Sequence, residues 1–271
     1  MVCARGWGPC LRGLCTGVGD KGFLIVAHRM RQNRVSMKHL PFQAAIIDLD
    51  GTMVDTLGDF HVVLQHTLAD MGCHPIELAR IDREFLSLTV GKGTDDLLRR
   101  SLAHAWGLPD DAAEALEAVP EAWRHYQRHY DRLNGQHADV FPGVPEGLRR
   151  LRELGVPLAC LTNKPTAFAE QLLVAKGLRG HFLHVFGGDA FERKKPDPLP
   201  LRKTCEALGR EPAATLMVGD SSNDAQAARA AGCPVLLVTY GYNHGHPITE
   251  VPALAYVDGL DQVDWARLFA A

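Results

Sequence analysis

Short apolar runs alternate with helical patterns along most of the chain after residue 43. The runs are nearly continuous, as expected for parallel strands that are covered on both faces. Glycines follow the helical stretches, at the positions where helices commonly end. This rhythm predicts an α/β fold, a doubly wound parallel sheet with a Rossmann-like core. The predicted strands are 44–49, 157–161, 183–187, 215–219 and 234–239, and the predicted helices are 144–154, 166–176, 198–209 and 223–231.

One long interval breaks this rhythm. Between the first strand and residue 140 the pattern is helical throughout, which predicts an inserted α-helical segment. Trp123, Tyr126 and Tyr130 recur there at helical spacing, and such a stripe is typical of a buried face rather than of the alternative, an RNA-binding surface. A last helix, 260–269, is expected to pack on the sheet. The helices predicted within the insertion are 56–71, 76–87, 94–106 and 111–133.

Composition narrows the class of protein. The 271 residues are 46% hydrophobic and 23% charged, with a net charge of −3, which is ordinary for a globular protein and indicates neither a nucleic-acid nor a membrane partner. No apolar run approaches the ~20 residues that span a bilayer. The seven cysteines form no CxxC pair. They predict reduced thiols in a cytoplasmic protein.

The N-terminal segment differs from the rest. Residues 1–40 carry seven Lys or Arg residues against one acid. We interpret them as an extension that is either disordered or not native, with Met37 as the expected first residue; a transit peptide is the alternative. Intact-mass measurement of the native protein tests this. We expect a core from residues 41–54 and 140–271, and a helical cap from residues 55–139.

Polar side chains gather where the predicted strands end. Asp48 and Asp50 close the first strand, Thr162 and Asn163 follow the second, and Asp220 follows the fourth. In an open α/β sheet, ligands bind outside the carboxyl ends of the strands. These groups are therefore expected to meet at one edge of the sheet.

The residue types at this edge indicate phosphoryl transfer. Asp48, Asp50 and Asp220 would repel one another unless a hard cation such as Mg²⁺ joined them. Asp48 and Asp50 are two positions apart, so in extended chain both side chains point the same way. One can attack while the other moves protons, which is the chemistry of an aspartyl-phosphate intermediate. A Ca²⁺-binding EF-hand loop is excluded because Gly51 stands fourth rather than sixth.

A second set of residues is suited to holding phosphate. Gly51 permits close approach of the backbone, and a hydroxyl, a main-chain amide and an ammonium group are donors to phosphate oxygens. The predicted phosphate-binding residues are Gly51, Thr52, Thr162, Asn163 and Lys195.

Four motifs in order resemble the haloacid dehalogenase-like hydrolase superfamily. They are DLDGT at 48–52, TNK at 162–164, KKPDP at 194–198 and GDSSND at 219–224. The resemblance implies a nucleophile and Mg²⁺ ligand at Asp48, and an acid/base at Asp50 that also binds Mg²⁺ through its carbonyl oxygen. It further implies a Mg²⁺ ligand at Asp220, a supporting partner of the metal site at Asp224, and a helical cap.

Within this superfamily, the sequence is similar to the phosphoglycolate phosphatase family. VGKGTDDLLRRSL (90–102), FPGV (141–144), LTNKP (161–165), RKKPDP (193–198) and TYGYN (239–243) carry the likeness. It implies hydrolysis of 2-phosphoglycolate to glycolate and phosphate. Lys92, between two glycines of the predicted cap loop, is a candidate for binding the substrate carboxylate; a solvated loop lysine is the alternative.

Other functions stay open on the sequence alone. A phosphatase or pyrophosphatase with another small substrate, a phosphomutase and an inert binding protein are the alternatives. Gly219 disfavours the phosphomutase, whose relatives typically carry Glu there. His244 and His246 form an H-x-H without a third ligand, which is typical of an exposed loop rather than of a metal site. Oligomeric state has no signal in the sequence.

Overall fold

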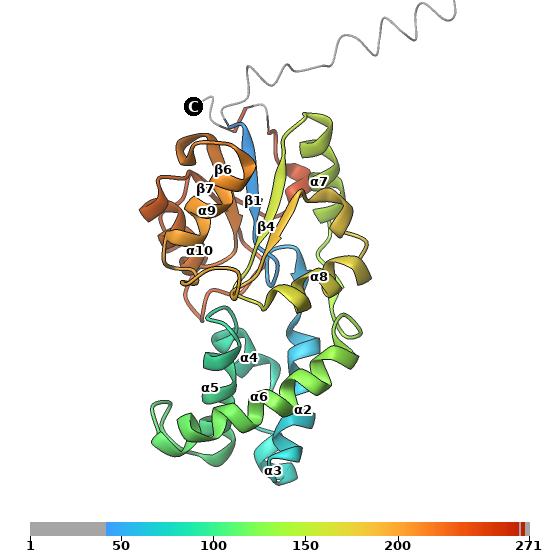
Figure 1. Cartoon of the computed structure of the whole chain (residues 1–271), viewed down its shortest axis with the longest axis vertical. Helices are drawn as coiled ribbons and strands as arrows, with labels where there is room; N and C mark the ends of the chain where they lie inside the picture. The colour runs from blue at the N-terminus through green and yellow to red at the C-terminus, as the bar shows by residue number, and fades with distance from the viewer. Residues whose placement is uncertain (1–41, 266, 269–271) are drawn as a thin grey trace, which may run out of the picture. The chain divides into compact units, whose positions relative to one another are not determined.

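The computed structural model describes residues 42–265 and 267–268 (Figure 1). The predicted extension at 1–40 lies outside the described residues. Six parallel strands of the described chain form one sheet in the order β5-β4-β1-β6-β7-β8. This order places β1 at the centre, between β4 and β6. The strands are β1 (Ala44–Ile47), β4 (Leu158–Leu161), β5 (His184–Phe186), β6 (Thr215–Gly219), β7 (Val235–Val238) and β8 (Ala255–Val257).

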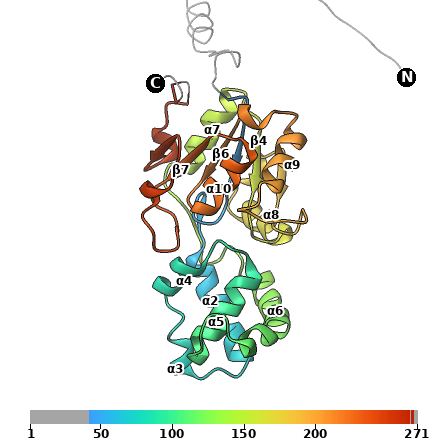
Figure 2. The ribbon, with the colours of Figure 1, turned by 90° about the vertical axis from the view of Figure 1, so that its left-hand side faces the viewer.

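Both faces of the sheet are covered by helices, as Figures 1 and 2 show. Side chains alternate along a strand, so Ala45 and Ile47 join one buried cluster, while Ala44 and Ile46 join the other. The first cluster packs under α7 (Val144–Glu153) and α8 (Thr166–Ala175). The second packs under α9 (Leu199–Leu208) and α10 (Ser222–Ala231). The predicted doubly wound α/β fold is confirmed.

Five helices between β1 and α7 form a separate hydrophobic cluster, which we call the cap. Tyr126 and Tyr130 are buried within this cluster, so their helical spacing does reflect packing. Within the described part of the chain, no helix is long and apolar enough to cross a membrane. The cap helices are α2 (Leu57–Asp70), α3 (Pro75–Leu78), α4 (Arg83–Thr89), α5 (Thr94–Trp106) and α6 (Ala113–Leu133).

Two short strands connect the cap to the sheet. β2 (Val54–Asp55) pairs antiparallel with β3 (Asp139–Val140), which holds the two linkers side by side. Just beyond β2, the buried carboxylate of Asp59 accepts hydrogen bonds from the amides of Gly135 and His137, at 2.6 and 2.7 Å. Both ends of the cap are therefore tied to each other at the point where they leave the sheet.

Two predicted helices are wrong in part. The helix expected at 76–87 is divided into α3 and α4, because Asp82 accepts a hydrogen bond from the Phe85 amide and begins a new helix. At the C-terminal end, only a 3₁₀ turn, η5 (Leu260–Gln262), forms within the described part of 260–269. Val263 is extended there, which turns Trp265 into the core against Phe42.

Two further features bear on the predictions. Strand β8 was not predicted; it is only three residues long, and its middle residue, Tyr256, is exposed. The four cysteines of the described chain are free and buried, in agreement with the prediction of reduced thiols; they are Cys73, Cys160, Cys205 and Cys233.

Candidate active site

Three neighbouring strands bring the predicted acidic and polar residues together. β1 ends just before Asp48, β4 just before Thr162 and β6 just before Asp220. Since β1 lies between β4 and β6, these three residues emerge side by side from one edge of the sheet. The Asp48 amide continues the pairing of β1 with β6 by donating to the Val218 carbonyl at 2.9 Å.

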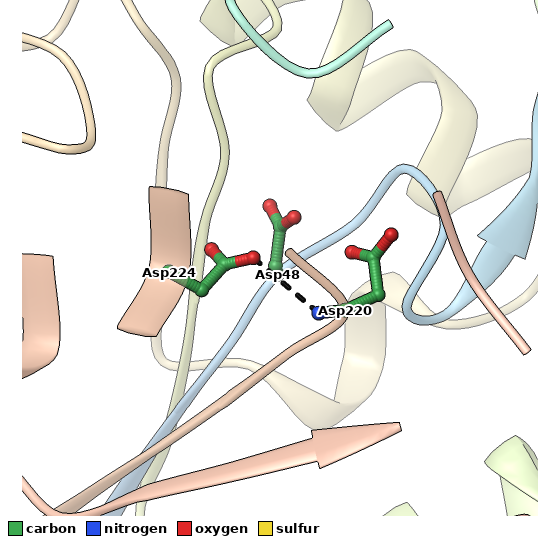
Figure 3. A group of neighbouring side chains, drawn as sticks. All are labelled: Asp48, Asp220 and Asp224. Atoms are coloured by element: carbon green, nitrogen blue, oxygen red, sulfur yellow. Dashed lines mark hydrogen bonds between the residues drawn. The ribbon is translucent and has the colours of Figure 1, made fainter. Parts of the chain in front are cut away.

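Asp48, Asp220 and Asp224 form a buried acidic group (Figure 3). One carboxylate oxygen from each residue lies within 4.8 Å of the others. Figure 3 shows Asp48 between Asp224 and Asp220. The carboxyl groups of Asp48 and Asp220 both point toward the top of this view. This is the one group of its kind in the described residues, and its hard oxygen donors suit a divalent cation such as Mg²⁺.

Burial makes these carboxylates reluctant to ionise in the absence of a metal. It raises the pKa of Asp48 to about 7, with Lys195 opposing the shift and Asp224 adding to it. Burial likewise raises the pKa of Asp220 well above its usual value, and the neighbouring Asp224 and Asp48 raise it further. A bound cation would offset both effects by favouring the charged forms.

Lys195 connects two members of this group. Its Nζ lies 2.8 Å from Asp48 Oδ1 and 2.7 Å from Asp224 Oδ1, and it donates to the Leu161 carbonyl at 2.9 Å. Burial by itself lowers the pKa of Lys195, but the carboxylates of Asp224 and Asp48 raise it above its usual value. The ammonium is therefore a fixed positive charge beside Asp48.

Other neighbours hold the side chains of Asp220 and Asp224. Asp220 accepts hydrogen bonds from the Thr52 hydroxyl at 2.8 Å and from the Tyr242 amide at 2.7 Å. Asp224 Oδ2 accepts from the amide and the hydroxyl of Ser221, which caps the start of α10. Both oxygens of Asp224 are thus occupied within the protein, which fits the supporting place that was predicted for it.

Gly51 is required by the position of Asp220. Its φ is 83°, and a Cβ there would lie 2.2 Å from Asp220 Oδ2. Gly51 and Thr52 were predicted to bind phosphate. In the structure Gly51 makes room for Asp220 and Thr52 orients it, and neither residue lines the cavity described below.

Thr162 and Asn163 lie at the predicted place but make unequal contacts. Thr162 Oγ1 is 3.5 Å from Asp50 Oδ2. The Asn163 side chain donates to the carbonyls of Lys195 and Gly91, at 2.8 and 2.9 Å, and accepts from the Lys195 amide. Asn163 therefore joins the lysine loop of the core to the cap loop that contains Gly91.

Asp50 is paired with a residue that the sequence analysis did not select. Lys164 Nζ lies 2.7 Å from Asp50 Oδ1, and the Lys164 side chain is 3% exposed. Within the part of the chain that the structure describes, the Asp50 side chain joins no group of three possible metal ligands, and a metal contact through its carbonyl oxygen stays a prediction. The signal for Lys164 was its place in TNK, directly after the strand that delivers Thr162.

These residues line one cavity between the sheet edge and the cap. Lys92, predicted to select substrate from the cap loop, is exposed and does not line this cavity. His244 is half-buried, with Nε2 3.3 Å from Asn223 Nδ2, so its expected exposure is wrong; His246 is exposed. The lining residues are Asp48, Asp50, Phe60, Val90, Gly91, Gly93, Thr94, Leu97, Thr162, Asn163, Lys164, Lys195, Asp220, Ser221, Asn223, Asp224 and Tyr242.

The site combines a buried carboxylate at a strand end, an acidic group and a lysine, and it lies under a helical cap. This arrangement on an α/β sheet is that of a hydrolase. The chain belongs to the haloacid dehalogenase-like hydrolase family, whose model matches residues 45–238. The family predicted from the sequence is thereby confirmed.

Named relatives narrow the comparison. A phosphoglycolate phosphatase of Thiobacillus denitrificans is 40% identical over 223 residues, which cover 82% of this chain and 93% of the relative. A phosphoglycolate phosphatase of Escherichia coli is 38% identical, over 74% of this chain and 82% of the relative.

Solved structures agree with the fold. A predicted phosphoglycolate phosphatase from Haemophilus somnus superposes with a TM-score of 0.72 at 29% identity, over 82% of this chain and 96% of that one. A predicted phosphatase from Clostridium acetobutylicum, at 22% identity and a TM-score of 0.66, covers 82% and 95% of the two chains and shares the fold.

Proposed function

We propose that this chain is a Mg²⁺-dependent phosphomonoesterase that hydrolyses 2-phosphoglycolate to glycolate and phosphate in the cytoplasm. The observation that carries the proposal is the convergence of Asp48, Asp220 and Lys195 at the ends of adjacent strands, inside a cavity that the cap closes. The names of the relatives support the choice of substrate.

Asp48 is the proposed nucleophile. Its carboxylate oxygen bonds to phosphorus while the bond from phosphorus to the ester oxygen breaks, which leaves an aspartyl-phosphate and an alkoxide. Lys195 lies 2.8 Å from Asp48 Oδ1 and would neutralise phosphate oxygens there, together with Thr162 and the Asn163 amide.

Asp50 is the proposed acid and base. It lines the same cavity two positions after Asp48, and its proton would go to the leaving alkoxide to give glycolate. The resulting carboxylate would then take a proton from water as the water oxygen attacks phosphorus. That second step releases inorganic phosphate and restores Asp48.

The acidic group would hold the metal ion. The carboxylates of Asp48 and Asp220 are the proposed side-chain ligands, with the carbonyl oxygen of Asp50 as a third, while Asp224 keeps Lys195 and Ser221 in place. When bound, Mg²⁺ would supply positive charge to the phosphate. Its donor set is all oxygen, as this ion requires.

A panel of phosphate esters tests the proposal. With Mg²⁺ present, we expect a higher kcat/KM for 2-phosphoglycolate than for sugar phosphates, nucleotides or pyrophosphate, measured by phosphate release. If the protein released little phosphate from any of these substrates, the proposed phosphatase activity would be contradicted. Preference for a sugar phosphate or pyrophosphate would keep the chemistry but replace the substrate.

A further inference from the structure

Lys164 is a buried cation that the proposed chemistry leaves without a role. It is 5% exposed, lies on the core side of the cavity, and pairs with Asp50 Oδ1 at 2.7 Å. Burying a charge is costly unless partners offset the loss of water. The burial of the Lys164–Asp50 pair is therefore costly, which suggests that the pair has a function.

Two aromatic rings of the cap cover the same ammonium group. Lys164 Nζ lies 4.4 Å from the centre of the Phe60 ring and 5.0 Å from that of Tyr130. Phe60 belongs to α2 and Tyr130 to α6, so the cap contributes both rings. The quadrupoles of these rings attract the ammonium in addition to the attraction of its partner anion. The ammonium can consequently change its anionic partner while it stays against the rings.

Two lysines line the cavity in the described part of the chain, and they contact different acidic side chains. Lys195 is committed to Asp48 and Asp224, on the side where phosphate would bind. Lys164 is committed to Asp50 alone among the acids, on the side where the ester oxygen would receive its proton. The lining therefore offers one cation for the phosphate and a second for the leaving group.

The dimensions of the substrate match this separation. In 2-phosphoglycolate a single methylene separates the ester oxygen from the carboxylate carbon. An ester oxygen close enough to accept a proton from Asp50 places that carboxylate in the immediate neighbourhood of the Asp50 side chain, where the Lys164 ammonium lies.

We infer that Lys164 is the specificity-determining residue of this enzyme and binds the carboxylate of the leaving group. This rests on the proposed function. With no substrate, the ammonium pairs with Asp50; when the substrate enters, its carboxylate replaces Asp50 as the partner of the ammonium. A leaving group without an anion cannot make this exchange and leaves the Lys164–Asp50 pair in place.

The test compares two substrates that differ in the carboxylate alone. These are 2-phosphoglycolate and 2-hydroxyethyl phosphate, which both release an alkoxide and both need a proton from Asp50. We expect wild-type protein to prefer 2-phosphoglycolate in kcat/KM. Lys164→Met keeps the apolar stem and removes the charge, and should lower this preference about 100-fold. Lys164→Arg keeps the cation and should retain part of the preference.

The controls separate binding from positioning. An equal loss for both substrates in Lys164→Met would overturn the inference, because Lys164 would then act through Asp50 alone. Lys203→Met, at an exposed lysine paired with Glu206 on α9, should leave the preference unchanged. Lys92→Met tests the rival lysine of the cap loop: loss of the preference there, with its retention in Lys164→Met, also overturns the inference.

Two further arms keep the outcome clear. Circular dichroism and thermal unfolding establish whether each variant folds, and Lys164→Gln replaces Lys164→Met if the latter does not. A wild-type protein that shows no preference for 2-phosphoglycolate refutes the proposed function itself. A wild-type preference that survives in folded Lys164→Met or Lys164→Gln refutes only the role of Lys164.

Discussion

The core and the cap contribute different chemistry to the same cavity. The core supplies every charged side chain of the lining, from the loops that follow β1, β4 and β6, from the loop that contains Lys195 and, for Asp224, from the first turn of α10. The cap supplies apolar and small residues, namely Phe60, Val90, Gly91, Gly93, Thr94 and Leu97. The charged groups are thus built on the rigid edge of a sheet, whereas the cap provides shape and excludes water.

The two regions also meet through polar contacts at one point of the cap loop. The Gly91 carbonyl accepts hydrogen bonds from the side chains of Asn163 and Asn223, at 2.9 and 3.3 Å. Both amides come from the core. The core therefore fixes its own reactive groups and also positions the cap loop, through Asn163 after β4 and Asn223 in the first turn of α10.

The largest loss of activity is expected when the nucleophile of the core is removed. Asp48→Asn should lower kcat by about 10⁴ or more, since the variant cannot form the aspartyl-phosphate. Rapid acid quench of wild-type protein with ³²P-labelled 2-phosphoglycolate should leave label on Asp48 that hydroxylamine releases. Full turnover by a folded Asp48→Asn variant would rule out the covalent route.

The next largest effect is expected at the fixed cation of the core. Lys195→Met should lower kcat/KM by about 10²–10³ for all phosphate esters, because the phosphate loses a positive charge in a site shielded from water. It should also destabilise the protein by about 3–5 kcal/mol, since the buried Asp48 and Asp224 lose their partner. Lys194→Met is the matched control at the neighbouring, partly exposed lysine, and should be nearly silent.

The affinity for Mg²⁺ should rise with pH, because the pKa of Asp48 is raised in the metal-free protein. In the metal-free protein this pKa is raised from 3.8 to about 7, so the stability contributed by the protonated group is present below pH 3.8 and lost as the pH rises to about 7. Mg²⁺ requires the ionised group and gains affinity over the same range.

Thermal unfolding measures this effect. Mg²⁺ at 100 times its Kd for pH 7.5 should raise the Tm by roughly 5–10 °C at pH 7.5, and the same concentration should raise it much less at pH 5.5. Asp220→Asn should remove most of the Mg²⁺ effect at both pH values. Equal Tm increases at both pH values in wild-type protein would contradict the assignment of the acidic group as the metal site.

The smallest kinetic effect is expected from the apolar side of the cavity. Leu97→Ala should lower kcat/KM by about tenfold or less, and by the same factor for 2-phosphoglycolate and 2-hydroxyethyl phosphate, because an apolar cap residue does not distinguish the carboxylate. Leu116→Ala, at an exposed position of the cap, serves as the control. A change in the ratio of the two substrates would assign recognition of the carboxylate to the cap.

Much of the core could be predicted because its signals are local. A run such as that of β1, buried on both faces, is nearly all apolar, and the acids that follow it stand at the strand end. The errors lie where a local pattern competes with a distant contact. The helix expected at 76–87 divides where Asp82 caps a new helix, and the helix expected at 260–269 gives way as Trp265 turns into the core.

The sequence by itself determined the fold class, the order of the motifs and the residue types that phosphoryl transfer needs, because strand runs and strand-end motifs are written in consecutive residues. Only the tertiary structure decided which lysine faces the cavity in addition to Lys195. Lys92 stands in a suggestive loop but is exposed, whereas Lys164 is buried against Asp50, Phe60 and Tyr130. Those partners are all far from Lys164 in the sequence, and only folding brings them to its charge.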